Sequence, residues 1–81
     1  MGPIVFREKG YRFYFLSKSE QERHVHVVSA DGEAKYWLEP KIELAENNYY
    51  SEQQLNEVRL LIEHHRDELI DAWLQRFYSG S

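Results

Sequence analysis

The chain has 81 residues, of which 42% are hydrophobic and 15% aromatic, and its formal net charge is −4. This length predicts one domain with a small core, because so short a chain buries only about 60–65% of the surface that it exposes when unfolded. The absence of cysteine excludes disulfide bonds and thiolate metal ligands. The acidic charge disfavours a dedicated nucleic-acid binder, which needs a basic surface to displace counterions.

The sequence has no signal-peptide pattern and no apolar run near the roughly 18 residues that a membrane-spanning helix requires. We therefore expect a cytoplasmic protein that does not contact a membrane. The acidity is uneven, since residues 51–78 hold six acidic and three basic side chains, whereas residues 1–50 hold eight and seven. A partner that docks on the C-terminal segment is accordingly expected to be a basic protein.

The first part of the chain predicts a β-hairpin. Residues 4–7 and 11–16 are rich in aromatic and β-branched side chains, which favour strands. Lys9-Gly10 lies between them and supplies the positive φ that a tight turn demands. The polar residues 17–23 that follow are predicted to form a mobile loop.

A second hairpin is predicted from residues 24–29 and 34–38, with its turn at Asp31-Gly32. After it, Pro40 interrupts the pattern. Residues 42–45 then form either a short edge strand or part of an ordered loop.

The predicted turn sets the register of the second hairpin. A two-residue loop at Asp31-Gly32 places His26 opposite Trp37 and His24 opposite Glu39. Because strand side chains alternate, one face is apolar and contains Val25, Val27, Tyr36 and Leu38. The other face carries His24, His26, Lys35, Trp37 and Glu39.

The C-terminal part predicts one long helix over residues 52–78. Ser51 is a candidate N-cap with Gln54 three residues on, and no proline or glycine occurs from there to Ser79. With strands over about residues 3–46, the whole of residues 1–81 is predicted to be a single domain, and residues 79–81 are expected to be a vector-derived tail.

The helix is amphipathic, and its apolar stripe consists of Leu55, Val58, Leu61, Ile62, Leu69, Ala72 and Trp73. His65 lies within this stripe and should be buried or half-buried with a hydrogen-bond partner, whereas His64 points to solvent. The elements together predict an α+β fold, in which an antiparallel sheet of three to five strands packs against one long amphipathic helix.

The histidines are the candidate site. His24 and His26, two residues apart on a strand, project the same way, and His65 or Glu39 supplies a third ligand for zinc or manganese. The three histidines converge only if a bulge turns a strand histidine inward or the helix covers the His–Trp face. If the helix covers the Val25 and Val27 face instead, no such site forms, and the histidines are either a non-metal functional surface or structural residues.

Five further side chains are candidates for catalysis or binding. Glu39 is either a general base paired with His24 or a cross-strand charge partner. Trp37 and Trp73 either stack on a ligand or belong to the core. Lys35 and Glu33 lie on the same hairpin as Trp37 and complete the predicted binding surface.

Several segments resemble a family of small bacterial proteins known only as a domain of unknown function. They are Pro3–Phe15, His24–Val27, Gly32–Pro40 and His65–Leu69, followed by Trp73. The family pattern is Pro-Pro-His-x-His, Gly-Glu-x-Ala, and His-Arg-x-Glu-Leu followed by tryptophan. This chain departs from it at Glu22-Arg23, where the family usually has two prolines.

The resemblance implies a partner, because members are commonly encoded beside another small uncharacterised domain, as in toxin–antitoxin pairs. The leading expectation is an intracellular protein–protein interaction module without a cofactor, which binds a protein partner or itself. The alternative is a metal-dependent hydrolase or nuclease that uses His24, His26 and His65. A third interpretation treats these histidines as a polar cluster that fixes how helix and sheet dock.

Overall fold

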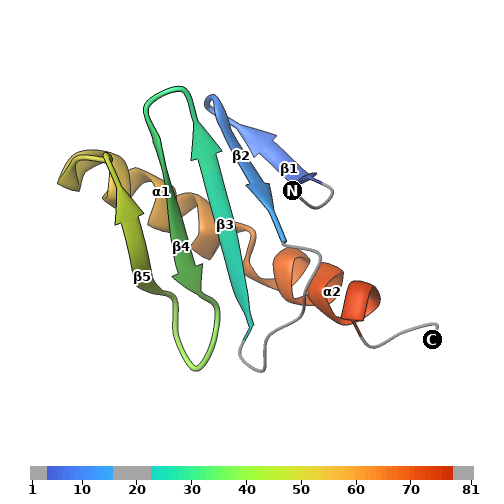
Figure 1. The fold of residues 1–81 in the computed structure, drawn as a ribbon. Coiled ribbons are helices and arrows are strands. Elements are labelled where there is room, and N and C mark those ends of the chain that lie inside the picture. The colour runs from blue at the N-terminus through green and yellow to red at the C-terminus, as the bar shows by residue number, and fades with distance from the viewer. Residues whose placement is uncertain (1–3, 16–22, 78–81) are drawn as a thin grey trace.

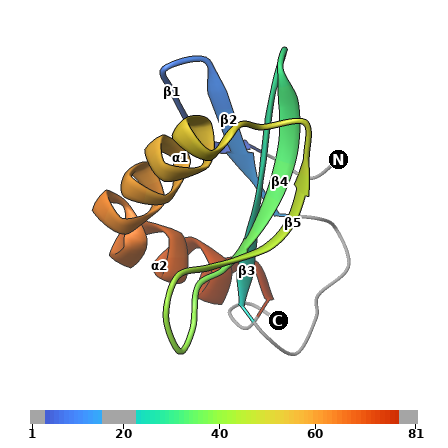
Figure 2. The ribbon, with the colours of Figure 1, turned by 90° about the vertical axis from the view of Figure 1, so that its left-hand side faces the viewer.

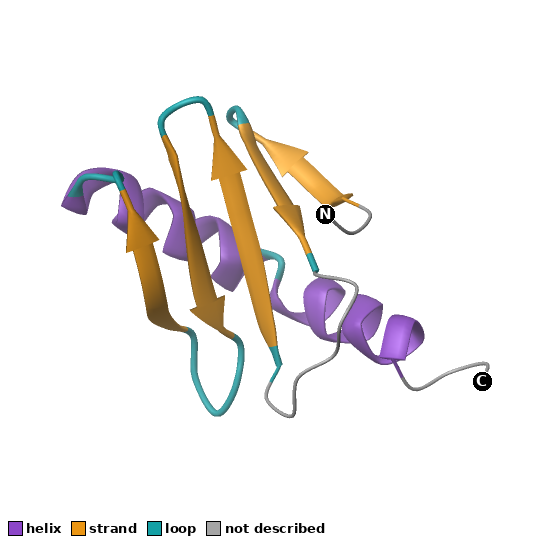
Figure 3. Ribbon diagram, in the orientation of Figure 1, coloured by secondary structure: helices purple, strands orange, loops and turns teal. Residues whose placement is uncertain are grey.

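The computed structural model describes residues 4–15 and 23–77. Five strands are followed by two helices (Figures 1 and 3): β1 (Ile4–Glu8), β2 (Tyr11–Tyr14), β3 (His24–Ser29), β4 (Gly32–Trp37), β5 (Glu43–Asn48), α1 (Glu52–His64) and α2 (Arg66–Phe77). The predicted loop lies outside the described residues except for Arg23, and the predicted tail lies outside them entirely.

The five strands form one antiparallel sheet in which spatial order follows chain order, β1-β2-β3-β4-β5. The α+β class and the antiparallel sheet are therefore confirmed, with five strands at the upper limit of the prediction. The segment after Pro40 is a strand rather than a loop, and it extends to Asn48 at the edge of the sheet.

The first hairpin forms at the predicted turn. Lys9 and Gly10 both have positive φ, at 53° and 84°. Phe6 pairs with Phe13, and their rings stack with centroids 4.3 Å apart. This hairpin therefore turns a pair of aromatic side chains toward the core.

The second hairpin forms in a register different from the predicted one. Its turn consists of Ala30 and Asp31, so that His24 lies opposite Trp37 and His26 opposite Lys35. The displacement is two residues, and since side chains alternate, such a shift preserves the predicted faces. His24, at the start of β3, is the exception in its surroundings, because it is buried against Trp73 of the core. Gly32 is thus the first residue of β4 and not a turn residue.

The helical segment begins as predicted. The Ser51 hydroxyl accepts a hydrogen bond from the Gln54 backbone N–H, and the Gln54 side chain accepts one from the Ser51 N–H. The expected single helix is, however, divided at His65, which has φ −104° and ψ 17°. Hydrogen bonds of the i to i−4 type still join His65 to Leu61 and Leu69, so the two helices follow each other directly.

Both helices lie on the same side of the sheet (Figure 2). They cover the face that carries Val25 and Val27, both with 0% exposure. The core that they enclose consists of Tyr11, Phe13, Phe15, Val25, Val27, Ala34, Tyr36, Leu38, Tyr50, Val58, Leu61, Ile62, Leu69 and Trp73. The predicted helical face is confirmed, with Leu55 partly buried and His64 exposed. Neither described helix is long and apolar enough to cross a membrane.

Candidate functional site

His65 lies at the junction of the two helices and links them to β1. Its Nε2 is 2.8 Å from a carboxylate oxygen of Glu8, and its Nδ1 is 2.8 Å from one of Glu68. Its ring also stacks on Phe6, with centroids 4.0 Å apart. The expected half-buried histidine with a hydrogen-bond partner is therefore confirmed, and it has two such partners.

These contacts favour the charged imidazolium. A neutral imidazole carries one N–H, whereas two carboxylates at hydrogen-bond distance call for a donor on each ring nitrogen. Burial acts to lower the pKa of His65, but the hydrogen bonds to Glu68 and Glu8 and the charges of these groups outweigh it and raise the pKa above 6.5. His65 thus holds β1 to α2 through charge-assisted hydrogen bonds.

His24 is a core histidine. It is the first residue of β3 and lies beyond the last pair between β2 and β3, which joins Tyr14 to His26. At this end of the strand its ring lies 5.1 Å from that of Trp73 and 6.0 Å from that of Trp37, centroid to centroid. With 1% exposure, His24 packs between the tryptophans of β4 and α2.

The three histidines do not come together. The rings of His24 and His26 are 5.0 Å apart, but the partners of His65 lie on β1 and α2. Within residues 4–15 and 23–77, no group of three histidine, aspartate or glutamate side chains is placed to hold a metal ion. The histidines are separated because the helices cover the sheet face that carries Val25 and Val27. His65 therefore lies on the opposite side of the sheet from His26.

Glu39 does not face His24, contrary to the predicted register. It forms an ion pair with Arg23, and its other carboxylate oxygen lies 4.0 Å from the Arg66 guanidinium. Trp37 takes the position opposite His24, so the predicted cross-strand position of Glu39 is wrong. Glu39 is instead a charge partner that joins the strand end to α2.

The sheet face opposite the helices carries the remaining candidates. The ammonium group of Lys35 lies 4.7 Å from the centroid of the half-buried Trp37 ring, and Tyr14 stacks on His26 with centroids 5.3 Å apart. Burial raises the pKa of Tyr14, and the charge of Glu33 raises it further. Together with Glu33, these side chains give the face an aromatic and charged character.

A hollow of about 230 Å³ lies in this face. Its lining is about equally polar and apolar and consists of Tyr14, His26, Glu33, Ala34, Lys35, Glu46 and Asn48. Three of the predicted site residues, His26, Lys35 and Glu33, therefore line one hollow. Trp73 is not part of it, because this ring lies in the core with 1% exposure and packs against Phe15.

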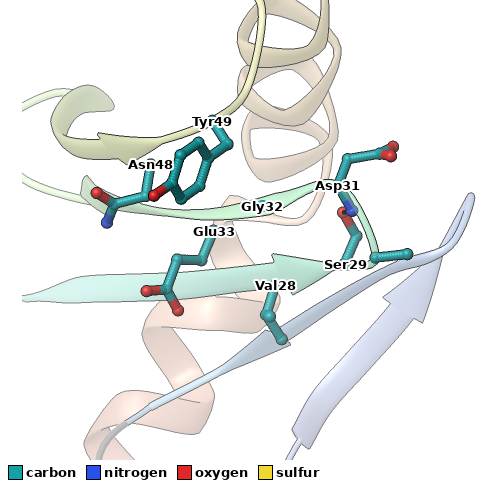
Figure 4. A pocket seen from close by; sticks show the side chains of 8 residues that line it. Val28, Ser29, Asp31, Gly32, Glu33, Asn48 and Tyr49 are labelled. Carbon is teal, nitrogen blue, oxygen red and sulfur yellow. Dashed lines mark hydrogen bonds between the residues drawn. The ribbon is translucent and has the colours of Figure 1, made fainter.

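Sequence reasoning missed a second hollow, of about 530 Å³, beside the β3–β4 turn (Figure 4). Tyr49 lines it, and this side chain is 89% exposed on a residue with φ 81°. Figure 4 shows the Asp31 side chain pointing away from Tyr49, and Asp31 accepts a hydrogen bond from Gln54. The available signal was the Asn47-Asn48 pair before Tyr49, because asparagine marks a chain reversal.

The fold and this face define a small α+β domain whose sheet is covered by helices on one side and presents aromatic and charged side chains on the other. The chain belongs to the family described as a domain of unknown function (DUF4160), whose profile matches residues 10–74. Comparison with curated proteins gave no match, and comparison with solved structures gave none.

Proposed function

We propose that this chain is a cytoplasmic protein–protein interaction module that acts as one member of a toxin–antitoxin-like pair. Its partner docks on the sheet face opposite the helices. The observation that carries this proposal is the half-buried Trp37 with the Lys35 ammonium 4.7 Å from its ring centroid. The resemblance noted in the sequence supports a partner, because members of that family are commonly encoded beside another small domain.

The composition of this face supports docking. An antiparallel sheet with one solvated face needs only polar side chains there. Here the face carries two aromatic side chains, the half-buried Trp37 and Tyr14, which is only 8% exposed, with charged groups around them. Tryptophan and tyrosine are enriched among residues that dominate binding energy, and a rim of charge supplies specificity.

The experiment combines growth and capture. Expression of one member of the pair alone should slow growth, and co-expression with the neighbouring gene product should relieve it. Trp37→Ala should weaken capture of that product by at least about tenfold, because a buried aromatic anchor contributes 2 kcal/mol or more in typical interfaces. Circular dichroism should show that the variant remains folded.

Leu60→Ala is the matched control. Leu60 is a large apolar side chain, 57% exposed on α1, so its truncation removes similar chemistry from the helical side of the molecule. This variant should capture the neighbouring protein as the wild type does. Recovery of only this chain from its native host, with Trp37→Ala folded and silent in growth, would contradict the proposal.

A further inference from the structure

We infer that the partner adds a basic strand to the free edge of β5. This inference rests on the proposed function and specifies the partner's chemistry and position. β5 pairs only with β4, and among the described residues no element lies along its other side. Five of its six side chains are exposed. Such an edge offers a row of backbone N–H and C=O groups to an incoming strand.

The side chains of β5 set the charge of the incoming strand. Residues 43–48 contain two acidic residues and no basic one. An irregularity in the register opposite Lys35 and Tyr36 places Glu43 opposite Trp37 and Glu46 opposite Lys35. Since Lys35 and Trp37 share a face, both glutamates lie on the face that the helices leave open.

The acidic row extends inward to Glu33 on β4, which pairs with Asn48. Among the described residues, Glu43 lies 3.9 Å from the Lys41 ammonium, whereas Glu33 and Glu46 form no ion pair, so that Glu46 is the uncompensated charge of β5. Opposite charges on neighbouring strands stabilise a sheet, and like charges destabilise it. A strand with lysine or arginine at alternate positions is therefore the complement of this edge.

The same charges disfavour a second copy of this chain. Antiparallel pairing of β5 with β5 about a two-fold axis keeps the open face of both copies on the same side. Glu43 and Glu46 of each copy would then share that side across two adjacent strands. This arrangement concentrates negative charge, which a basic strand neutralises instead.

The hollow beside the β3–β4 turn lies where β5 ends. Asn48, the last residue of β5, lines it together with Glu33 and Tyr49 (Figure 4). A strand that pairs with β5 and bends over its end would reach this hollow and meet a carboxylate and an exposed aromatic ring. Both groups attract a cationic side chain, by ion pairing and by cation–π contact.

The test uses a short synthetic peptide of alternating lysine and valine residues and the purified full chain. Nuclear magnetic resonance should show slower amide exchange in residues 43–48 when this peptide is added. A peptide of the same sequence with N-methylated backbone nitrogens keeps the charge but loses the donors, and it should give no protection. Equal protection with both peptides would overturn the inference, because binding would then be electrostatic alone.

Charge reversal supplies the second arm. Glu46→Lys should weaken binding of the unmodified peptide by about tenfold, whereas Asp71→Lys, the same charge change on an exposed residue of α2, should alter it less than about threefold. Equal effects of both changes would contradict the inference. A second result would also contradict it: the wild-type chain forms a dimer that Glu46→Lys alters, and the peptide does not protect the amides of β5. In that case the edge of β5 binds a second copy of the chain. If Trp37→Ala weakens capture of the neighbouring protein but Glu46→Lys does not, the proposed function stands and the edge inference fails.

Discussion

Gly32→Ala tests the close approach of β4 to the end of β5. A Cβ at this position would lie less than 3.0 Å from the Asn48 carbonyl oxygen and 3.2 Å from the Tyr49 Cβ. Both obstacles belong to the chain segment that leaves the sheet, so neither can be relieved by a side-chain rotation. Overpacking of this kind costs about 1–3 kcal/mol. The loss of glycine freedom in the unfolded chain offsets about 0.4–1 kcal/mol of this.

The net expectation is a loss of about 1–2 kcal/mol in the free energy of unfolding, which lowers the melting temperature by about 5–15 °C for a domain of this size. Differential scanning calorimetry measures it directly. Gly10 provides the contrast, because no atom lies within 4 Å of its Cβ position but its φ is +84°. Alanine there introduces backbone strain without a clash.

Asparagine separates the two causes, because it tolerates positive φ better than alanine but is larger. Gly10→Asn should therefore be more stable than Gly10→Ala, and Gly32→Asn less stable than Gly32→Ala. A Gly32→Ala protein that melts within about 2 °C of the wild type, or the same ranking at both glycines, would refute the reasoning. It would also remove the support for the position of Tyr49 beside the docking edge.

Leu69→Ala, at 0% exposure, should cost about 2–5 kcal/mol in urea unfolding, and a loss below 1 kcal/mol would disprove the docking face. The raised pKa of His65 means that its contacts with Glu8 and Glu68 stabilise the fold fully below pH 6.5 and that this stabilisation is lost as the pH rises through the higher pKa of the folded state. His65→Gln should remove this part of the pH dependence, which urea midpoints between pH 5 and 9 would reveal; an unchanged profile would count against the contacts. Zinc or manganese should leave the melting temperature unchanged, and a rise that His26→Ala abolishes would restore the metal-dependent alternative.

The faces of the strands could be predicted because alternation of side chains is a local property. Val25 and Val27 are buried and Trp37 lies on the opposite face, as the pattern indicates. The register was wrong because a shift of two residues preserves every face, so that the hydrophobic pattern does not distinguish the two pairings. Gly32 is required because a Cβ there would collide with the backbone of Asn48 on β5. A local turn pattern does not reveal a contact with another strand.

The site was predicted only in part, for a similar reason. Helical periodicity identifies His65 as half-buried, but it does not reveal that the helix is divided there, since no proline or glycine marks the position. The contacts of His65 with Phe6 and Glu8 join residues far apart in the sequence. The burial of His24 was not predicted for the same reason, because it depends on Trp73 of α2, which is far away in the sequence.

The strand order also governs how this chain is made. Every hydrogen-bonded pair of strands is formed by consecutive segments, so each hairpin can close within about 1–10 μs of its synthesis. The helices that cover the apolar face are encoded after the strands, and at about 5–20 residues per second their synthesis takes a few seconds. A nascent sheet therefore exposes Val25, Val27 and Phe13 on the ribosome far longer than it needs to form. During that interval chaperones can bind the apolar face. It becomes inaccessible to them when α1 and α2 pack on the sheet.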